Sequence, residues 1–252
     1  MAIWNAMTAE EQRHVLAELP SDFIIPGEED RVPEGDQHSD PQSDIKATLK
    51  AWFARDLEDV REPAGASAPT AYIAANLAVY YPGERVFAPD VMVVCGAEQS
   101  QRPNWAVANE GRGLDVALEV HVLGHRAKDF KRNVTWFARL GIAEYFVYNV
   151  PRGALSGYRL DAASSTQYVA MLPRAGRLHS RKLDLDLAVY EGELRFFHRG
   201  ALVPTPTERV DQALRLADAR TREAEAESQR AEAESQRAEA ESQRAEAESQ
   251  RA

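Results

Sequence analysis

Apolar residues along this chain gather in short runs that predict β-strands. The runs at 91–95, 116–122 and 144–149 are rich in Val, Tyr and Phe, and we expect each of them to form a strand. The run at 71–81 also reads as a strand, although its many alanines leave a helix open. Short alternating segments further along predict antiparallel hairpins, at 155–160, 167–172, 183–187 and 194–198.

Three segments carry the spacing and end signals of helices. Thr8 opens a capping box before a segment that ends near Leu19, and Asp44 caps a segment with apolar residues at helical spacing. The helix predicted at 129–140 ends at Gly141, a residue typical of a helix C-terminus. The order strand, strand, helix, strand and then hairpins predicts an α/β fold in which helices flank a mixed β-sheet core.

Composition divides the chain into three predicted parts. Residues 1–18 form an N-terminal helical lead-in, 19–207 form the α/β domain, and 208–252 form a charged C-terminal helix. Inside the domain, the polar stretches 20–43 and 96–113 are predicted to be loops.

The C-terminal part repeats one heptad without change. The sequence Ala-Glu-Ala-Glu-Ser-Gln-Arg begins at Ala224 and starts again at Ala231, Ala238 and Ala245. A seven-residue period is typical of a coiled coil, through which two copies would form a homodimer. The seam would consist of small Ala and Ser residues, however, and opposite charges four residues apart also stabilise a single solvated helix. Both interpretations stay open.

Charge and composition limit how the protein could bind nucleic acid and where in the cell it is expected. The formal net charge is -10; the nine Glu and five Arg from Arg222 onward contribute -4, which leaves -6 for the rest. Nucleic acid would therefore bind to a local basic patch and not to a global positive field. We expect a cytoplasmic protein, because no apolar run is long enough to span a membrane and no secretory signal is present. The single cysteine, Cys95, is expected to be a buried, inert thiol.

Two of the predicted strands carry an isolated carboxylate. Asp90 directly precedes the 91–95 strand, and Glu119 lies inside the 116–122 strand. A buried carboxylate is costly unless it has a partner, so Asp90 could be a turn cap and Glu119 could pair with His121 or an arginine. The alternative is that the two carboxylates meet at one edge of the sheet, where they would suit a hard cation such as Mg²⁺.

Strand alternation places Glu119 and His121 on one face of their strand and the apolar Leu118 and Val120 on the other.

The pattern Pro89-Asp90 followed by Glu119-Val120-His121 resembles the Pro-Asp … (Asp/Glu)-x-Lys signature of the PD-(D/E)XK, restriction-endonuclease-like nuclease superfamily. Residues 129–146 are more specifically similar to the bacterial putative restriction endonuclease family within it. The family consensus Tyr-Ala-Arg-x-Gly-Val-x-Glu-Tyr-Trp is matched from Phe137 to Phe146, and 155–160 fits the strand that follows. The resemblance covers roughly 19–207, and heptad tails are frequent in that family.

The resemblance implies a restriction-endonuclease-like fold and metal-dependent hydrolysis of DNA phosphodiester bonds. The metal, Mg²⁺ or Mn²⁺, would lie between Asp90, Glu119 and the backbone carbonyl of Val120. A third acidic ligand usually comes from an N-terminal segment, where Glu34 is the candidate, with Asp36 and His38 beside it.

The chain departs from the family at the catalytic lysine. The position two residues after Glu119 holds His121, and the position that the lysine occupies on the following helix in some relatives holds Asn133. Lys131 is close in sequence but about 200° away around a helix. His121 could accept a proton in its place, and both His121 and Lys131 are catalytic candidates.

Two rival functions stay open, and the missing lysine favours the first of them. One is a nuclease-fold binding or assembly protein that has lost turnover and works through its heptad tail. The other is a metal-dependent hydrolase of a different phosphate ester.

A basic cluster follows the glutamate strand and is the expected DNA contact. Such charges bind backbone phosphates without reading bases, although they could equally form a solvated helix start. The cluster consists of Arg126, Lys128, Lys131 and Arg132.

Overall fold

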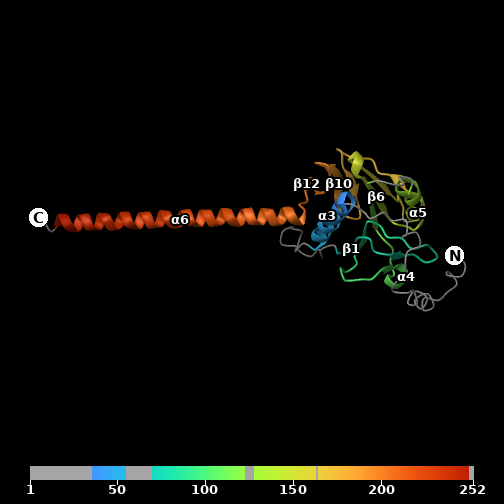
Figure 1. Cartoon of the computed structure of the whole chain (residues 1–252), viewed down its shortest axis with the longest axis horizontal. Coiled ribbons are helices and arrows are strands. Elements are labelled where there is room, and N and C mark those ends of the chain that lie inside the picture. The colour runs from blue at the N-terminus through green and yellow to red at the C-terminus, as the bar shows by residue number, and fades with distance from the viewer. Residues whose placement is uncertain (1–35, 55–69, 123–127, 163, 250–252) are drawn as a thin grey trace. The chain divides into compact units, whose positions relative to one another are not determined.

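The computed structural model describes residues 36–54, 70–122, 128–162 and 164–249. The chain separates into two compact units, Met1–Val203 and Pro204–Ala252, which are described in turn (Figure 1).

A six-stranded sheet forms the centre of the first unit. Only β5 and β6 pair in parallel, and every other neighbouring pair is antiparallel, so the sheet is mixed as predicted. The parallel pair is joined by a crossover that contains the π-helical turn η3 (Lys128–Arg132) and helix α5 (Asn133–Arg139). In spatial order the strands are β1 (Ala71–Ala74), β3 (Val91–Cys95), β5 (Val116–His121), β6 (Glu144–Asn149), β7 (Ala154–Arg159) and β8 (Val169–Ala170).

Each face of this sheet is buried by a different layer. On one face, Leu118 and Val120 belong to a core with residues of helix α3 (Asp36–Phe53) and of a second sheet. On the other face, Ala117 and Tyr145 pack with Trp136 of α5. The alternation predicted for the Glu119 strand therefore directs its even-numbered residues to α3 and its odd-numbered residues to α5.

The second sheet is antiparallel and has the order β12-β11-β10-β9. Its strands are β9 (Leu178–Ser180), β10 (Leu185–Tyr190), β11 (Glu193–His198) and β12 (Ala201–Leu202). The later hairpin segments thus build a separate layer against α3, while β7 and β8 extend the main sheet (Figure 1).

The buried carboxylate of Glu144 fastens the turn before β10 to the main sheet. It accepts hydrogen bonds from the Ser180 hydroxyl and from the backbone N–H groups of Arg181 and Lys182. Such bonds to a charged group satisfy a carboxylate that would otherwise be costly to bury.

Helix α3 is longer than the sequence predicted. It includes residues 36–43, which were expected to be loop, and it contains Pro41. The extra turns make contacts far along the chain, because Gln42 and His38 both bond to Asp90. Tertiary contacts of this kind stabilise a helix that local propensity does not favour.

The 71–81 and 96–113 segments also differ from expectation. The first is a strand only over β1, and β2 (Val79–Tyr80) pairs instead with β4 (Trp105–Ala106) as a small parallel ladder. The second segment holds β4 and the single-turn helix α4 (Val107–Glu110), so it is not all loop. Trp105 anchors this region, since its ring is fully buried and its indole N–H donates to the Arg112 carbonyl.

Cys95 is half-buried, with its thiol against the Lys182 carbonyl. Burial, with a smaller contribution from the charge of Asp115, raises the pKa of the Cys95 thiol to about 12. The reactive thiolate is therefore scarce near neutral pH.

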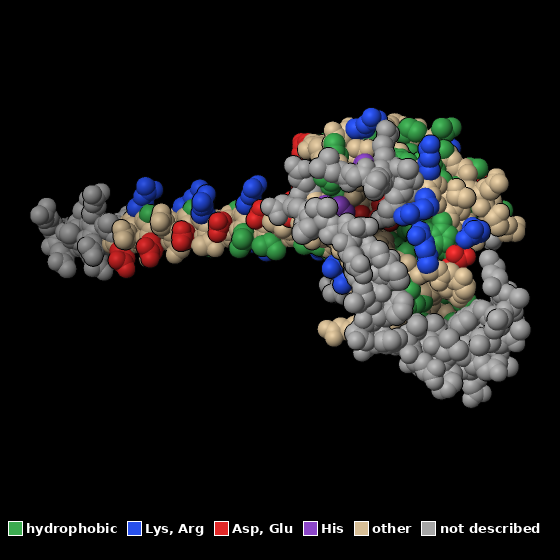
Figure 2. All heavy atoms as spheres, turned by 45° about the vertical axis from the view of Figure 1, so that its right-hand side comes forward, with side chains coloured by type: hydrophobic (Ala, Val, Ile, Leu, Met, Phe, Trp, Pro, Cys, Tyr) green, Lys and Arg blue, Asp and Glu red, His purple; other side chains and the backbone are tan. Residues whose placement is uncertain are grey.

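The second unit contains one long helix, α6 (Pro206–Ser249). A capping box starts it: the Glu208 N–H donates to the Thr205 hydroxyl, and the Thr205 N–H donates to the Glu208 carboxylate. Its side chains are exposed from 209 to 239, with a row of basic groups on one side and acidic groups on the other in Figure 2. Within the described residues, no helix is both long and apolar enough to cross a membrane.

Candidate metal and phosphodiester site

Asp90 closes the edge of the sheet where β3 stops short of the end of β5. The last residue pair of these two strands is Val91 with Leu118. Beyond this pair, the Val120 N–H of β5 points toward the β3 side but has no residue of β3 opposite it. The Asp90 carboxylate takes its place and accepts this N–H at 2.6 Å. Asp90 is 8 % exposed. It directly precedes β3, as predicted, and its carboxylate also bonds to β5, the strand that carries Glu119.

Two residues of α3 complete the surroundings of Asp90. The His38 Nε2 lies 3.1 Å from the Asp90 carboxylate, and the Gln42 amide donates to the Asp90 carbonyl at 2.9 Å. Neither contact was predicted, because residues 36–43 were expected to form a loop. His38 and Gln42 are four residues apart, and the core residue Ile45 follows three residues later. This helical spacing is the signal that could have revealed their contacts.

Glu119 lies on the α5 side of β5 and is almost fully buried. The Asn133 amide donates to its carboxylate at 3.3 Å. Burial, reinforced by the charges of Glu119 and Asp129, holds the pKa of the Tyr145 hydroxyl well above its usual value. Tyr145 is consequently neutral and donates to the Asp129 carbonyl at 3.0 Å.

Of the four predicted metal ligands, Asp90, Glu119 and Val120 belong to neighbouring segments at the ends of β3 and β5. The Asp90 carboxylate touches the peptide group that joins Glu119 to Val120. Because the N–H and C=O of a strand residue leave the strand on the same side, the Val120 carbonyl also faces the Asp90 side. Two carboxylates and one carbonyl form an all-oxygen set, which is the chemistry that Mg²⁺ prefers.

This oxygen set fits a magnesium-like ion that shares its coordination with water and substrate. Among the described residues, no three His, Cys, Asp or Glu side chains could hold a metal by themselves. Mg²⁺ commonly binds one or two carboxylates and keeps several waters, so a full protein cage is not required. The predicted third ligand, Glu34, lies outside the described residues.

His121 ends β5 on the same face as Glu119, and Asp129 orients its ring. The His121 Nδ1 is 3.0 Å from an Asp129 carboxylate oxygen, and Phe130 packs edge-on against the imidazole. Asp129 and Phe130 come from η3, a type of turn that is frequent at functional sites. The second Asp129 oxygen and the Asn133 amide oxygen are buried and accept no hydrogen bond from the described residues.

Lys131 is not brought to the carboxylates. Its side chain is exposed, and it makes no hydrogen bond or ion pair with Asp90 or Glu119 in the described structure. Asn133, two positions on, points inward to Glu119 instead. The helical rotation of about 200° between the two positions accounts for the difference.

The predicted basic cluster is described only in part. Arg126 and the side chain of Lys128 lie outside the described residues, while Lys131 and Arg132 are exposed. Arg132 borders a cavity of about 550 Å³ beside Trp136, together with Arg85 and Arg139. The Arg85 guanidinium lies 4.1 Å from the Trp136 ring centre.

Two comparisons with known proteins found similarities. Residues 22–189 match the Uma2 family, described as "Putative restriction endonuclease". A solved structure, described as a putative nuclease belonging to DUF820 from Anabaena variabilis ATCC 29413, is 13% identical with a TM-score of 0.42. That similarity covers 63% of this chain and 80% of the other. No curated protein matches the chain.

Proposed function

The chain belongs to the Uma2 family of putative restriction endonucleases, and we propose that it hydrolyses DNA phosphodiester bonds with the help of a divalent metal ion. One observation carries the proposal: the Asp90 carboxylate bonds to the peptide group beside Glu119, so that two acidic residues 29 positions apart in sequence share one sheet edge. Buried charges in proteins are normally paired or bound to a metal, and two carboxylates with oxygen atoms available suit a divalent cation.

Asp90, Glu119 and the Val120 carbonyl would hold Mg²⁺ or Mn²⁺, with Glu34 as the candidate for a further ligand. When bound, such an ion lowers the pKa of a water and offsets the negative charge that builds up on the phosphate. Lys131 and Arg132, exposed on the neighbouring helix, would bind DNA phosphates nearby.

His121 is the proposed proton acceptor. Asp129 engages its Nδ1, which leaves Nε2 to take the proton from the attacking water. A carboxylate that orients an imidazole in this way also stabilises the imidazolium that forms.

Asn133 favours a second candidate function. This residue places a neutral amide against Glu119 where the family resemblance expects a lysine. Without an ammonium group to orient and activate water, the protein would bind metal and DNA but turn over slowly or not at all. It would then act as a binding or assembly protein, with the heptad helix as its interaction element.

Incubation of the purified protein with supercoiled plasmid separates these functions. We expect nicked and linear products in Mn²⁺ or Mg²⁺ and intact plasmid in EDTA, because the carboxylates alone cannot activate water. A folded protein that leaves the plasmid intact with both metals would contradict hydrolysis and favour the binding function.

A further inference from the structure

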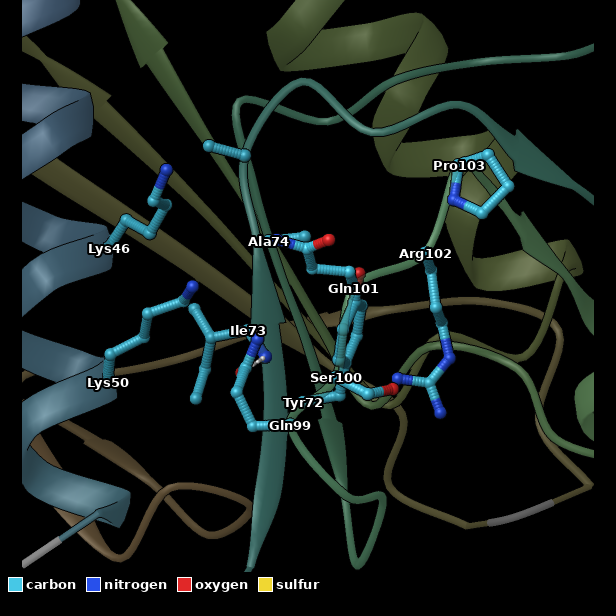
Figure 3. A pocket seen from close by; sticks show the side chains of 11 residues that line it. Lys46, Lys50, Tyr72, Ile73, Ala74, Gln99, Ser100, Gln101, Arg102 and Pro103 are labelled. Carbon is cyan, nitrogen blue, oxygen red and sulfur yellow. Dashed lines mark hydrogen bonds between the residues drawn. The ribbon is translucent and has the colours of Figure 1, made fainter.

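A polar groove crosses the outer edge of the sheet between α3 and the segment 99–103. Its volume is about 830 Å³, and β1 forms its floor (Figure 3). Lys46 and Lys50 extend from α3 on one side, and the 99–103 segment with Arg102 forms the other. The remaining lining residues are Tyr72, Ile73, Ala74, Ala75, Gln99, Ser100, Gln101 and Pro103.

The groove is basic although the protein is acidic. No carboxylate belongs to the residues that line it, whereas the whole chain carries a net charge of -10. Within the described structure, neither Lys46 nor Lys50 forms an ion pair. Two half-buried lysines without carboxylate partners among the described residues form a site for a ligand that carries repeated negative charge.

Arg102 has a different role on the opposite wall. Its guanidinium pairs with Glu110 at 2.8 Å, donates to the Glu98 carbonyl and lies over the rings of Tyr72 and Trp105. These contacts fix the wall in place and partly neutralise the arginine. The two lysines therefore supply the groove's uncompensated charge.

The groove adjoins the Asp90 site through α3. Lys46 and Lys50 follow His38 and Gln42 at intervals of four residues along the helix, so they lie about 6 and 12 Å beyond Gln42. On the floor, Ala75 lines the groove, and the next residue, Asn76, donates to the Gln42 side chain. Gln42 also bonds to Asp90, so the end of the groove and the carboxylate site share one hydrogen-bond chain.

One backbone donor on the floor is already occupied. An exposed edge strand normally attracts another strand through its free backbone groups. Here the side chain of Gln99 accepts the Ile73 N–H at 2.9 Å, so this group of β1 is not free to pair with a further strand. The groove thus offers side-chain amides, a hydroxyl and two ammonium groups, which suit phosphates and sugars better than a polypeptide backbone.

We propose that this groove holds the sugar–phosphate backbone of a nucleic acid strand on one side of the phosphate at the Asp90–Glu119 site. Lys46 and Lys50 bind successive phosphates, and the amides of Gln99 and Gln101 hydrogen-bond to the backbone. The proposal rests on the proposed function, because it extends the path of that substrate away from the carboxylates. Contacts of this kind fix the position of the strand and carry no base specificity.

A salt titration of DNA binding tests the groove without requiring turnover. The full chain, in Ca²⁺, is titrated against a fluorescein-labelled single strand and the matching duplex, with anisotropy as the readout. Lys46→Ala/Lys50→Ala is expected to weaken binding roughly 10-fold at 0.1 M salt and to lower the slope of log K against log salt by about 1.4 for the single strand or 1.8 for the duplex. The matched control is Arg174→Ala/Arg181→Ala, which removes two exposed charges outside the groove.

The outcomes separate the groove from the proposed hydrolysis. Weaker DNA binding by the lysine variant, with unchanged binding by the control, supports the groove as a DNA-binding site. The DNA form, single strand or duplex, whose binding weakens is the form that the groove holds. A parent that binds neither DNA, or a lysine variant that keeps the parent's affinity and salt slope, overturns it. Plasmid cleavage is scored separately, so a parent that binds through the groove and never cleaves contradicts hydrolysis alone.

Discussion

Asn133→Lys is expected to cleave DNA about 10²-fold faster than the parent protein, the size of effect that a well-placed proton-transfer group contributes. The Asn133 amide nitrogen lies 3.3 Å from the Glu119 carboxylate, so a lysine there would direct its ammonium to the same carboxylate edge. Glu119 would pair with the buried ammonium, and the Asn133 amide oxygen accepts no hydrogen bond from the described residues that the substitution would break. Initial rates of plasmid nicking in Mn²⁺ measure the gain.

Asn133→Met is the matched control for this gain, since it has similar length and no charge. It should cleave no faster than the parent. If Asn133→Lys folds, as judged by circular dichroism, and its rate equals that of Asn133→Met, position 133 does not serve as the lysine position of this site.

Glu119→Gln should lower the rate of metal-dependent cleavage by roughly 10²- to 10³-fold, the loss typical when a charge-stabilising group is removed from an active site. Glutamine keeps the shape of the side chain, and its carbonyl oxygen can still accept the Asn133 amide. It lacks the negative charge that attracts a divalent cation. The rate is compared at a metal concentration that saturates the parent.

Asp186→Asn is the control for removal of a carboxylate. Asp186 pairs with His179 on the second sheet and is absent from the proposed site. Its variant should cleave at the parent rate. Retention of the parent rate by Glu119→Gln would show that Glu119 does not take part in the reaction.

The strands were predictable because their signal is local. The Val-rich runs at 91–95 and 116–122 and the aromatic run at 144–149 are buried on both faces, and the structure confirms all three. Alternation within the second run placed Glu119 and His121 on one face, where Asn133 and Asp129 meet them. A period of two residues is enough to assign faces without tertiary information.

The start of α3 was not predictable by the same means. Residues 36–43 are polar and include Pro41, which predicted a loop. They are helical in the structure, where His38 and Gln42 bond to Asp90, some fifty residues away in sequence. Contacts at that separation leave no periodic signal in the chain itself.

The two candidate carboxylates stand out in the sequence, whereas the contacts that support them do not. The resemblance to a known family pointed to Asp90 and Glu119. The bond from Val120 to Asp90 depends instead on where β3 stops along β5, which is a matter of strand register. Similarly, Lys46 and Lys50 face a groove only because the 99–103 segment returns to the edge of β1.

A calorimetric titration of Mn²⁺ into the parent, Asp90→Asn and Glu119→Gln tests the proposed metal site most directly, because metal binding requires no turnover. The shared edge of Asp90 and Glu119 predicts a site in the parent that each substitution weakens strongly or removes, while Asp186→Asn binds as the parent does. A parent that binds no Mn²⁺, or substituted proteins that bind it with unchanged affinity, would contradict the assignment of these two carboxylates as a metal site.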